Sequence, residues 1–358
     1  MALPLQKDHS ENKSYGIGLD IIRIIAMFFV IMVHSTTFYG FKSEGVHSIV
    51  TAIAGAGRYL SYSCVPIFLL LTGYLTLNKK PEISYYLKLV KILIEFYLCA
   101  LAVAIFQILC VEGSEPFFAL IKKAAILAFP QYSWYMRMYL GLFLLAPFFN
   151  YIINSLSGKQ AVLLTVISVI LFSNPFISDF WQWGYPIMYY FIGSILRKTQ
   201  FRAPRILCLS AIPIMSIIGV VLYKYPVIPR FDIENYSNFV CLVISVSLFM
   251  LFSDIKFDAS RKFGGTLVKI TRTVANASMS TYLLSVIFDN LTTQLFSKLN
   301  IVTFSERFPF LLYLTPLKFI LSILCAIPIS ILSAYLFKMA LKIINKITSA
   351  KNAGNVLN

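Results

Sequence analysis

Apolar stretches of about 20 residues recur along the whole chain, and they restrict the possible folds more than any other feature. A helix of roughly 20 mainly apolar residues crosses the bilayer's hydrocarbon core, which is about 30 Å thick. Hydrophobic residues make up 58% of the chain and charged residues only 13%, whereas a soluble domain has about a quarter charged. A water-soluble enzyme is therefore excluded. The sequence predicts an all-α bundle of about ten membrane spans, at 17–39, 58–77, 86–111, 133–154, 160–179, 181–197, 205–223, 236–253, 275–295 and 316–341.

The basic residues indicate how this bundle is oriented. The net charge of +16 is compatible with nucleic-acid binding or with basic cytoplasmic loops. If the amino terminus is cytoplasmic, the inner segments hold 20 Lys and Arg residues and the outer segments hold 9. Cytoplasmic loops of membrane proteins carry such an excess. We therefore expect both termini in the cytoplasm, the lipid bilayer as a partner and no nucleic-acid partner.

The spacing of the spans predicts one membrane domain. We assign residues 1–16 and 342–358 to cytoplasmic tails and 17–341 to the membrane domain, because no loop is long enough for a soluble domain. No internal repeat is visible. The six cysteines lie in apolar stretches and form no CxxC pair, so we expect neither a disulfide framework nor a metal site.

The first span contains three residues that are costly in lipid, namely Asp20, Arg23 and His34. A charge at the bilayer centre costs at least about 2.5 kcal/mol, so each needs a partner or a function. Asp20 and Arg23 are three residues apart and can pair, either in a site or as an interfacial anchor. Arg23 and His34 are eleven residues apart, which places them on one helix face about 16 Å apart. A lone histidine often only bonds a neighbouring helix, but the aligned arginine favours a functional role.

Other basic residues lie near the ends of spans. Lys88 and Lys91 begin the third span, where they either anchor the topology and contact lipid head groups or clamp a polyphosphate ligand. Glu95 lies one turn after Lys91, so a salt bridge between them is expected. Arg137 in the fourth span either belongs to an interfacial belt or faces a polar cavity, with Asp289 as a possible partner.

These segments resemble acyltransferase family 3, the bacterial integral membrane acyltransferases that O-acylate cell-surface sugars and related acceptors. The resemblance covers most of the chain and rests on the combination of motifs. The matching residues are Leu19-Asp20, Arg23 and His34 in the first span, Val65-Pro66-Ile67-Phe68 and Thr72-Gly73-Tyr74 in the second, the pair Lys88 and Lys91, Trp134-Tyr135 with residues 141–145 and Pro147, residues 190–193, and residues 280–284.

The resemblance implies a function and a set of site residues. The expected reaction moves an acyl group, with acetyl as the expected form, from acyl-CoA to a hydroxyl of a glycan or lipid-linked sugar at the bacterial cytoplasmic membrane. Acyl-CoA is a co-substrate, and no bound cofactor is implied. His34 suits the catalytic base because imidazole exchanges a proton near neutral pH, and Arg23 is the second catalytic candidate. The candidate substrate-binding residues are Asp20, Lys88, Lys91, Tyr74, Trp134 and Arg137.

The sequence leaves several alternatives open. Many relatives carry further histidines where this chain has Tyr132-Ser133 and Ser285, which argues against a mechanism with a second histidine. His34 acts either as a base for direct transfer or as the carrier in an acyl-histidine relay. A transporter or flippase for a lipid-linked glycan, which also places Arg, His and Asp inside spans, is the alternative function. A sensory or lipid-binding membrane protein with a degenerate site is a third interpretation.

Overall fold

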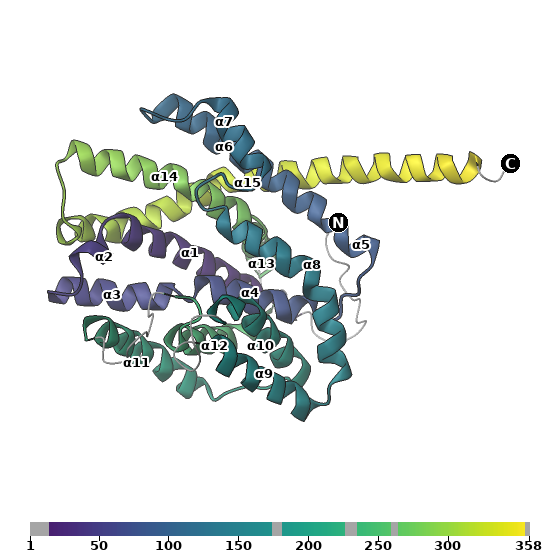
Figure 1. The fold of residues 1–358 in the computed structure, drawn as a ribbon, viewed down its shortest axis with the longest axis horizontal. Helices are drawn as coiled ribbons and strands as arrows, with labels where there is room; N and C mark the ends of the chain where they lie inside the picture. Colours follow the sequence, from purple (N-terminus) through teal and green to yellow (C-terminus); the bar gives the residue numbers. More distant parts are fainter. Residues whose placement is uncertain (1–13, 174–180, 226–234, 259–263, 355–358) are drawn as a thin grey trace.

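The computed structural model describes residues 14–173, 181–225, 235–258 and 264–354 (Figure 1). Helices account for nearly all regular structure in these residues, so the predicted all-α class is confirmed. The helices of the bundle are α1 (Gly18–Phe38), α3 (Ile49–Ser61), α4 (Cys64–Thr76), α6 (Lys88–Cys110), α8 (Trp134–Ser155), α9 (Gly158–Phe172), α10 (Tyr185–Thr199), α11 (Arg205–Lys224), α12 (Phe239–Ser253), α14 (Ser278–Lys298) and α15 (Phe304–Gly354).

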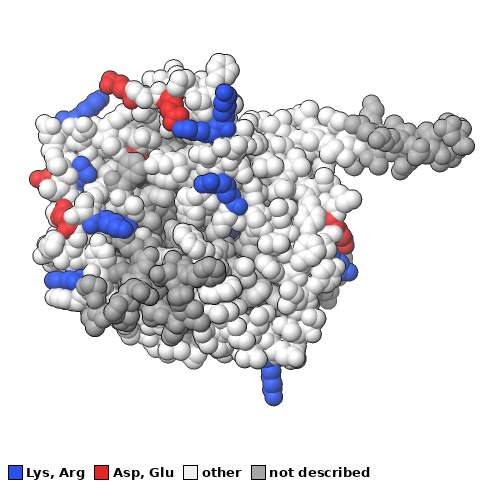
Figure 2. Space-filling view, viewed as in Figure 1, with Lys and Arg blue, Asp and Glu red and all other residues white. Residues whose placement is uncertain are grey.

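The helices agree with a multi-pass membrane protein. Six helical segments among the described residues are long and apolar enough to cross a bilayer, and α9 and α12 are shorter apolar helices. Large apolar side chains point outward from α9, α11 and α15, for example Leu163, Ile217 and Leu324. Figure 2 shows a largely uncharged face on which charged side chains are few and lie mostly toward the edges of the view. Such an apolar exterior suits lipid contact. The count of ten spans and the position of the termini stay predictions.

Several segment boundaries differ from those predicted. The second span was placed at 58–77, but the apolar segment begins at Ile49, and α3 and α4 form it together. Ser48 starts α3 because its hydroxyl accepts a hydrogen bond from the amide of Thr51 at 3.2 Å. The last helix extends well beyond the predicted 316–341 at both ends and includes part of the predicted 342–358 tail.

Short elements that we did not predict connect the spans. They are the helices α2 (Phe41–Glu44), α5 (Ile83–Tyr86), α7 (Phe117–Ala125) and α13 (Gly264–Asn276), the 3-10 turn η1 (Gln182–Gly184), and the strands β1 (Ser14–Gly16) and β2 (Lys256–Asp258). β1 pairs antiparallel with β2, and the amide of Gly18 donates to the carbonyl of Ile255 at 3.0 Å. A Cβ on Gly18 would lie 2.0 Å from the carbonyl oxygen of Phe252. The start of α1 is therefore fixed against the end of α12.

Close packing of α4 against α10 supports the centre of the bundle. A Cβ on Gly73 would lie 2.1 Å from the carbonyl oxygen of Tyr190, and a Cβ on Gly193 would lie 2.1 Å from that of Leu70. Only glycine permits this approach, as at other tight helix contacts in membranes. α1 contacts α3, α4, α12, α13, α14 and α15, so the polar side chains of the first helix face protein on several sides.

Arg58 and Lys318 lie at the outer ends of the predicted spans 58–77 and 316–341 and are among the nine basic residues counted as outer, but both are buried. Arg58 is 1% exposed and donates to the hydroxyls of Thr36 and Tyr62, each at 3.0 Å. Lys318 is 3% exposed and pairs with Asp289. Neither residue is a loop charge. When these two residues are left out of the outer count, the predicted excess of inner over outer basic residues becomes larger.

Candidate active site

A cavity of about 310 Å³ lies inside the bundle. Its walls come from α1, α4, α6, α8, α13 and α14, with Tyr236 just before α12. Four of the candidate catalytic and substrate-binding residues line it, namely Arg23, His34, Lys91 and Trp134. The polar face of the first helix therefore borders an internal space and not lipid.

Arg23 belongs to a group of charged residues near the start of α1. Its Nη1 lies 3.3 Å from Oδ1 of Asp20, and the Nε of Arg272 on α13 lies 3.7 Å from Oδ2 of the same carboxylate. Asp20 is outside the cavity lining but holds both guanidinium groups at this end. The pairing of Asp20 with Arg23 is confirmed. Arg272 was missed, because its approach depends on how α13 folds back onto α1.

His34 lies three turns further along α1. Its imidazole stacks on the ring of Tyr132, with centroids 3.8 Å apart and planes at 15°, and Tyr282 lies 6.3 Å away. Within the part of the chain that the structure describes, His34 makes no hydrogen bond. The imidazole is half-buried and borders the cavity, so its nitrogens are available to a bound molecule.

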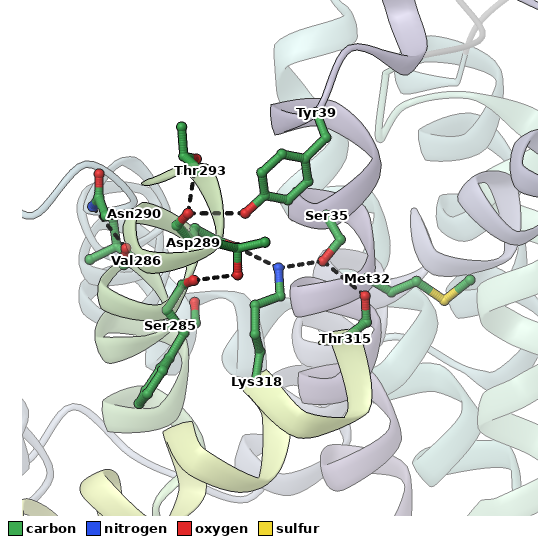
Figure 3. Close-up of polar contacts among 12 residues, drawn as sticks. Met32, Ser35, Tyr39, Ser285, Val286, Asp289, Asn290, Thr293, Thr315 and Lys318 are labelled. Carbon is green, nitrogen blue, oxygen red and sulfur yellow. Dashed lines mark hydrogen bonds and ion pairs between the residues drawn. The ribbon is translucent and has the colours of Figure 1, made fainter. Parts of the chain in front are cut away.

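A buried polar cluster around Asp289 and Lys318 joins α1, α14 and α15 (Figure 3). Asp289 on α14 accepts from Tyr132 through Oδ2 and from Lys318 of α15 through Oδ1, both at 2.7 Å. The ammonium group of Lys318 also donates to Ser35 at 2.6 Å, and Thr315 donates to Ser35 at 3.1 Å. Lys318 is thus the partner of Asp289, and Arg137, the partner that we considered from the sequence, is not.

The basic pair at the start of α6 divides between two environments. Lys91 lines the cavity, whereas Lys88 is exposed and lies outside the lining. The expected salt bridge between Lys91 and Glu95 is wrong for these two described residues. Glu95 is 4% exposed, borders the cavity and accepts from Ser280 at 2.6 Å and Ser333 at 3.4 Å. A buried carboxylate needs such donors, and here α14 and α15 supply them.

Besides Asp20 and Lys88, two further candidate binding residues do not border the cavity. Arg137 is exposed, because it follows the lining residue Met136 and points about 100° away around α8. Tyr74 also lies outside the lining. The guanidinium of Arg197 is 5.5 Å from its ring centroid and donates to its carbonyl at 3.0 Å, so Tyr74 connects α4 to α10. The sequence placed both residues in the correct helices but could not fix which way they face.

Aromatic residues form much of the remaining wall. Tyr135, Tyr139, Tyr236 and Tyr282 all border the cavity. Trp134 stacks on Tyr236, with centroids 5.8 Å apart and planes at 22°. The wall can therefore hold a largely apolar group beside a few polar ones.

Tyr132 and Ser285, where the family resemblance leads us to expect histidines, have two different environments. Tyr132 contacts His34 directly, as described above. Ser285 is 1% exposed, donates to the carbonyl of Tyr282 at 2.8 Å and does not border the cavity. Among the described residues, no group of three His, Cys, Asp or Glu side chains is placed to bind a metal ion.

Comparison with known proteins gives one match. Residues 17–337 match the acyltransferase domain of family 3, which is nearly the whole chain. Neither the curated proteins nor the solved structures contain a match. Together with the apolar helices, the family match shows that this chain belongs to acyltransferase family 3 and is a multi-pass membrane acyltransferase.

Proposed function

We propose that the protein moves an acyl group, with acetyl as the expected form, from acyl-CoA to a hydroxyl of a cell-surface sugar or a lipid-linked glycan precursor. The site would lie in the bacterial cytoplasmic membrane, with the donor entering from the cytoplasm. The observation that carries the proposal is that Arg23 and His34 line one cavity, with the imidazole free of hydrogen bonds to described residues.

The charges at the Arg23 end support an anionic donor. Arg23 and Lys91 both lie near the first residues of their helices and both border the cavity. Guanidinium and ammonium groups are the usual partners of phosphate. A cavity of about 310 Å³ is too small for a whole coenzyme A but suits its narrow thioester end. The phosphates would therefore stay at the mouth while the acyl group lies deeper.

The separation along α1 assigns different roles to Arg23 and His34. Eleven residues of helix rise place their backbones about 16 Å apart, so Arg23 does not reach a carbonyl that is beside His34. Arg23 is then a donor-binding residue, and His34 acts at the reacting atoms. This proposal places Arg23 on the acyl-CoA side and leaves the steadying of negative charge at the carbonyl to other groups.

The proposed step uses His34 as general base. Its imidazole takes the proton from the acceptor hydroxyl as the oxygen attacks the acyl carbonyl. The tetrahedral intermediate then breaks its carbon–sulfur bond, and the thiolate of coenzyme A takes the proton back from His34. An acyl-histidine relay is the second route. It requires attack by an imidazole nitrogen on the thioester before the acceptor enters.

The decisive test measures transfer directly. Inside-out membrane vesicles that carry the protein receive radiolabelled acetyl-CoA, and label in glycan or lipid-linked sugar is counted. His34→Ala should lower the rate by about 10²- to 10⁴-fold, the contribution of a general base. His47 is an exposed histidine outside the cavity, so His47→Ala is the matched control and should retain full activity. Retained transfer by His34→Ala would end the proposal, and glycan movement without label would favour a carrier.

A further inference from the structure

The orientation of His34 needs a physical cause. Catalytic bases are generally held by a hydrogen bond to a third group. His34 has no such bond among the residues that the structure describes. Of the two aromatic rings recorded beside it, that of Tyr132 is the nearer, with centroids 3.8 Å apart and planes at 15°. Packing against the ring of Tyr132 must therefore orient the imidazole of His34, which in other enzymes a hydrogen bond does.

Tyr132 is itself held at three points. Its hydroxyl donates to Oδ2 of Asp289 at 2.7 Å, its carbonyl accepts from the hydroxyl of Tyr282, and its ring lies 5.8 Å from that of Tyr282. Tyr132 is 4% exposed and does not border the cavity. It therefore has no access to the substrate and acts only through His34.

The contacts form a closed circuit that begins and ends on α1. From His34 the circuit passes to Tyr132 and then to Asp289 on α14. Asp289 is paired with Lys318 on α15, and Lys318 donates to Ser35, the residue after His34. The ion pair thus fixes both the tyrosine under the imidazole and the backbone that carries it.

We propose that Tyr132 is a positioning residue for His34, and that the buried Asp289–Lys318 pair fixes Tyr132 in place. This inference rests on the proposed role of His34 as base. It assigns a purpose to a buried ion pair that costs desolvation energy and is otherwise a poor source of stability. Four chain segments that are distant in sequence then act together to aim one imidazole into the cavity.

Substitutions of Tyr132 test the inference in purified protein reconstituted into vesicles. Tyr132→Phe keeps the stacked ring but frees it from Asp289, and Tyr132→Leu removes the flat face. An error of 1 Å in the position of a catalytic group costs up to about 10²-fold. We expect kcat to fall about tenfold for Tyr132→Phe and about a hundredfold for Tyr132→Leu, with an unchanged KM for acetyl-CoA.

Tyr85 provides a matched control. It is 4% exposed, stacks on Phe143 at 4.4 Å and 10°, and donates to the carbonyl of Phe143 at 2.9 Å. It lies outside the cavity lining. Tyr85→Phe should leave kcat and KM unchanged. If Tyr132→Phe lowers kcat, raises KM and lowers the melting temperature together, the role of Tyr132 is merely structural and the inference is overturned.

A double-mutant cycle tests the link to the ion pair. Asp289→Asn with Lys318→Met removes both charges, and kcat should fall about as far as for Tyr132→Phe. Adding Tyr132→Phe to that variant should cause little further loss, because all three changes break the same chain of contacts. If the losses in kcat multiply instead, Tyr132 acts independently of the Asp289–Lys318 pair, and the proposed link between them is contradicted.

The outcomes also distinguish this inference from the proposed function. Full activity of His34→Ala contradicts the proposed function and the inference together. An inactive His34→Ala variant combined with wild-type kcat in Tyr132→Phe and Tyr132→Leu contradicts only the inference.

Discussion

Replacing Lys318 offers the sharpest test of how the buried ion pair with Asp289 contributes to the stability of the bundle. The side chain of Lys318 is 4% exposed, and its ammonium group lies 2.7 Å from Oδ1 of Asp289, whose side chain is 1% exposed. Lys318→Met keeps an unbranched chain of similar length but removes the charge. The carboxylate of Asp289 then stays buried with Tyr132 but without a cation at that distance.

The expected loss of stability follows from the burial of the pair. Removing one partner of a buried ion pair costs about 3–5 kcal/mol, because the remaining charge is uncompensated. At about 2 °C per kcal/mol for a long chain, the melting temperature should fall by roughly 6–10 °C. Replacing both partners by neutral residues is often close to neutral. The variant with Asp289→Asn and Lys318→Met should therefore recover most of the lost stability, although not the activity.

The cysteines of the chain provide the assay. Cys64, Cys99, Cys208 and Cys241 are buried, and a thiol-reactive maleimide dye reaches them only when the bundle opens. Cys110 and Cys325 are exposed and would react at the start. Replacing these two by serine removes the background. A Lys318→Met variant that melts at the wild-type temperature, or a double variant that melts as low as the single one, would show that Lys318 does not neutralise a buried Asp289 carboxylate.

The remaining predictions concern the cavity mouth, the packing and the outer end. Lys91→Met should raise the KM for acetyl-CoA, whereas Lys88→Met should not, because only Lys91 of the two borders the cavity. Equal effects of the two substitutions on transfer kinetics would contradict the different roles of Lys88 and Lys91. Gly193→Ala should destabilise the protein by about 1–3 kcal/mol in the maleimide assay, because its new Cβ would lie 2.1 Å from a carbonyl of α4. Gly141→Ala, whose Cβ would meet nothing within 4 Å, is the control and should not destabilise. Glu44 accepts hydrogen bonds from the hydroxyl of Ser305 and from the first two amides of α15, and these bonds hold its pKa below the usual range. The stability that Glu44 adds is therefore present at neutral pH and lost as pH falls through that lowered pKa. The difference in melting temperature between wild type and Glu44→Gln should therefore shrink on acidification, and a constant difference would contradict the assignment.

The parts of the site that could be predicted lie within single helices. Arg23 and His34 face the same side because the α-helical period fixes their relation, whatever surrounds the helix. The pairing of Asp20 with Arg23 follows from the same rule. The cost of charge in lipid directed attention to these residues before any tertiary contact was known.

The parts that could not be predicted depend on how helices rotate against one another. Arg137 and Tyr74 lie in helices that line the cavity but face elsewhere. Lys318 was counted as an outer charge because the predicted last span began only two residues earlier, whereas its helix begins at Phe304. Tyr132 and Asp289 are 157 positions apart in sequence, and no local pattern relates them.

A structure of the protein in lipid with a hydrolysis-resistant acetyl-CoA analogue tests most directly whether Arg23 and His34 belong to one acyl-CoA site. We expect phosphates near Arg23 and Lys91 and the acyl carbon beside the His34 imidazole, at a distance that leaves room for the acceptor hydroxyl. An analogue that binds outside this cavity, or that directs its acyl end away from His34, would contradict this expectation.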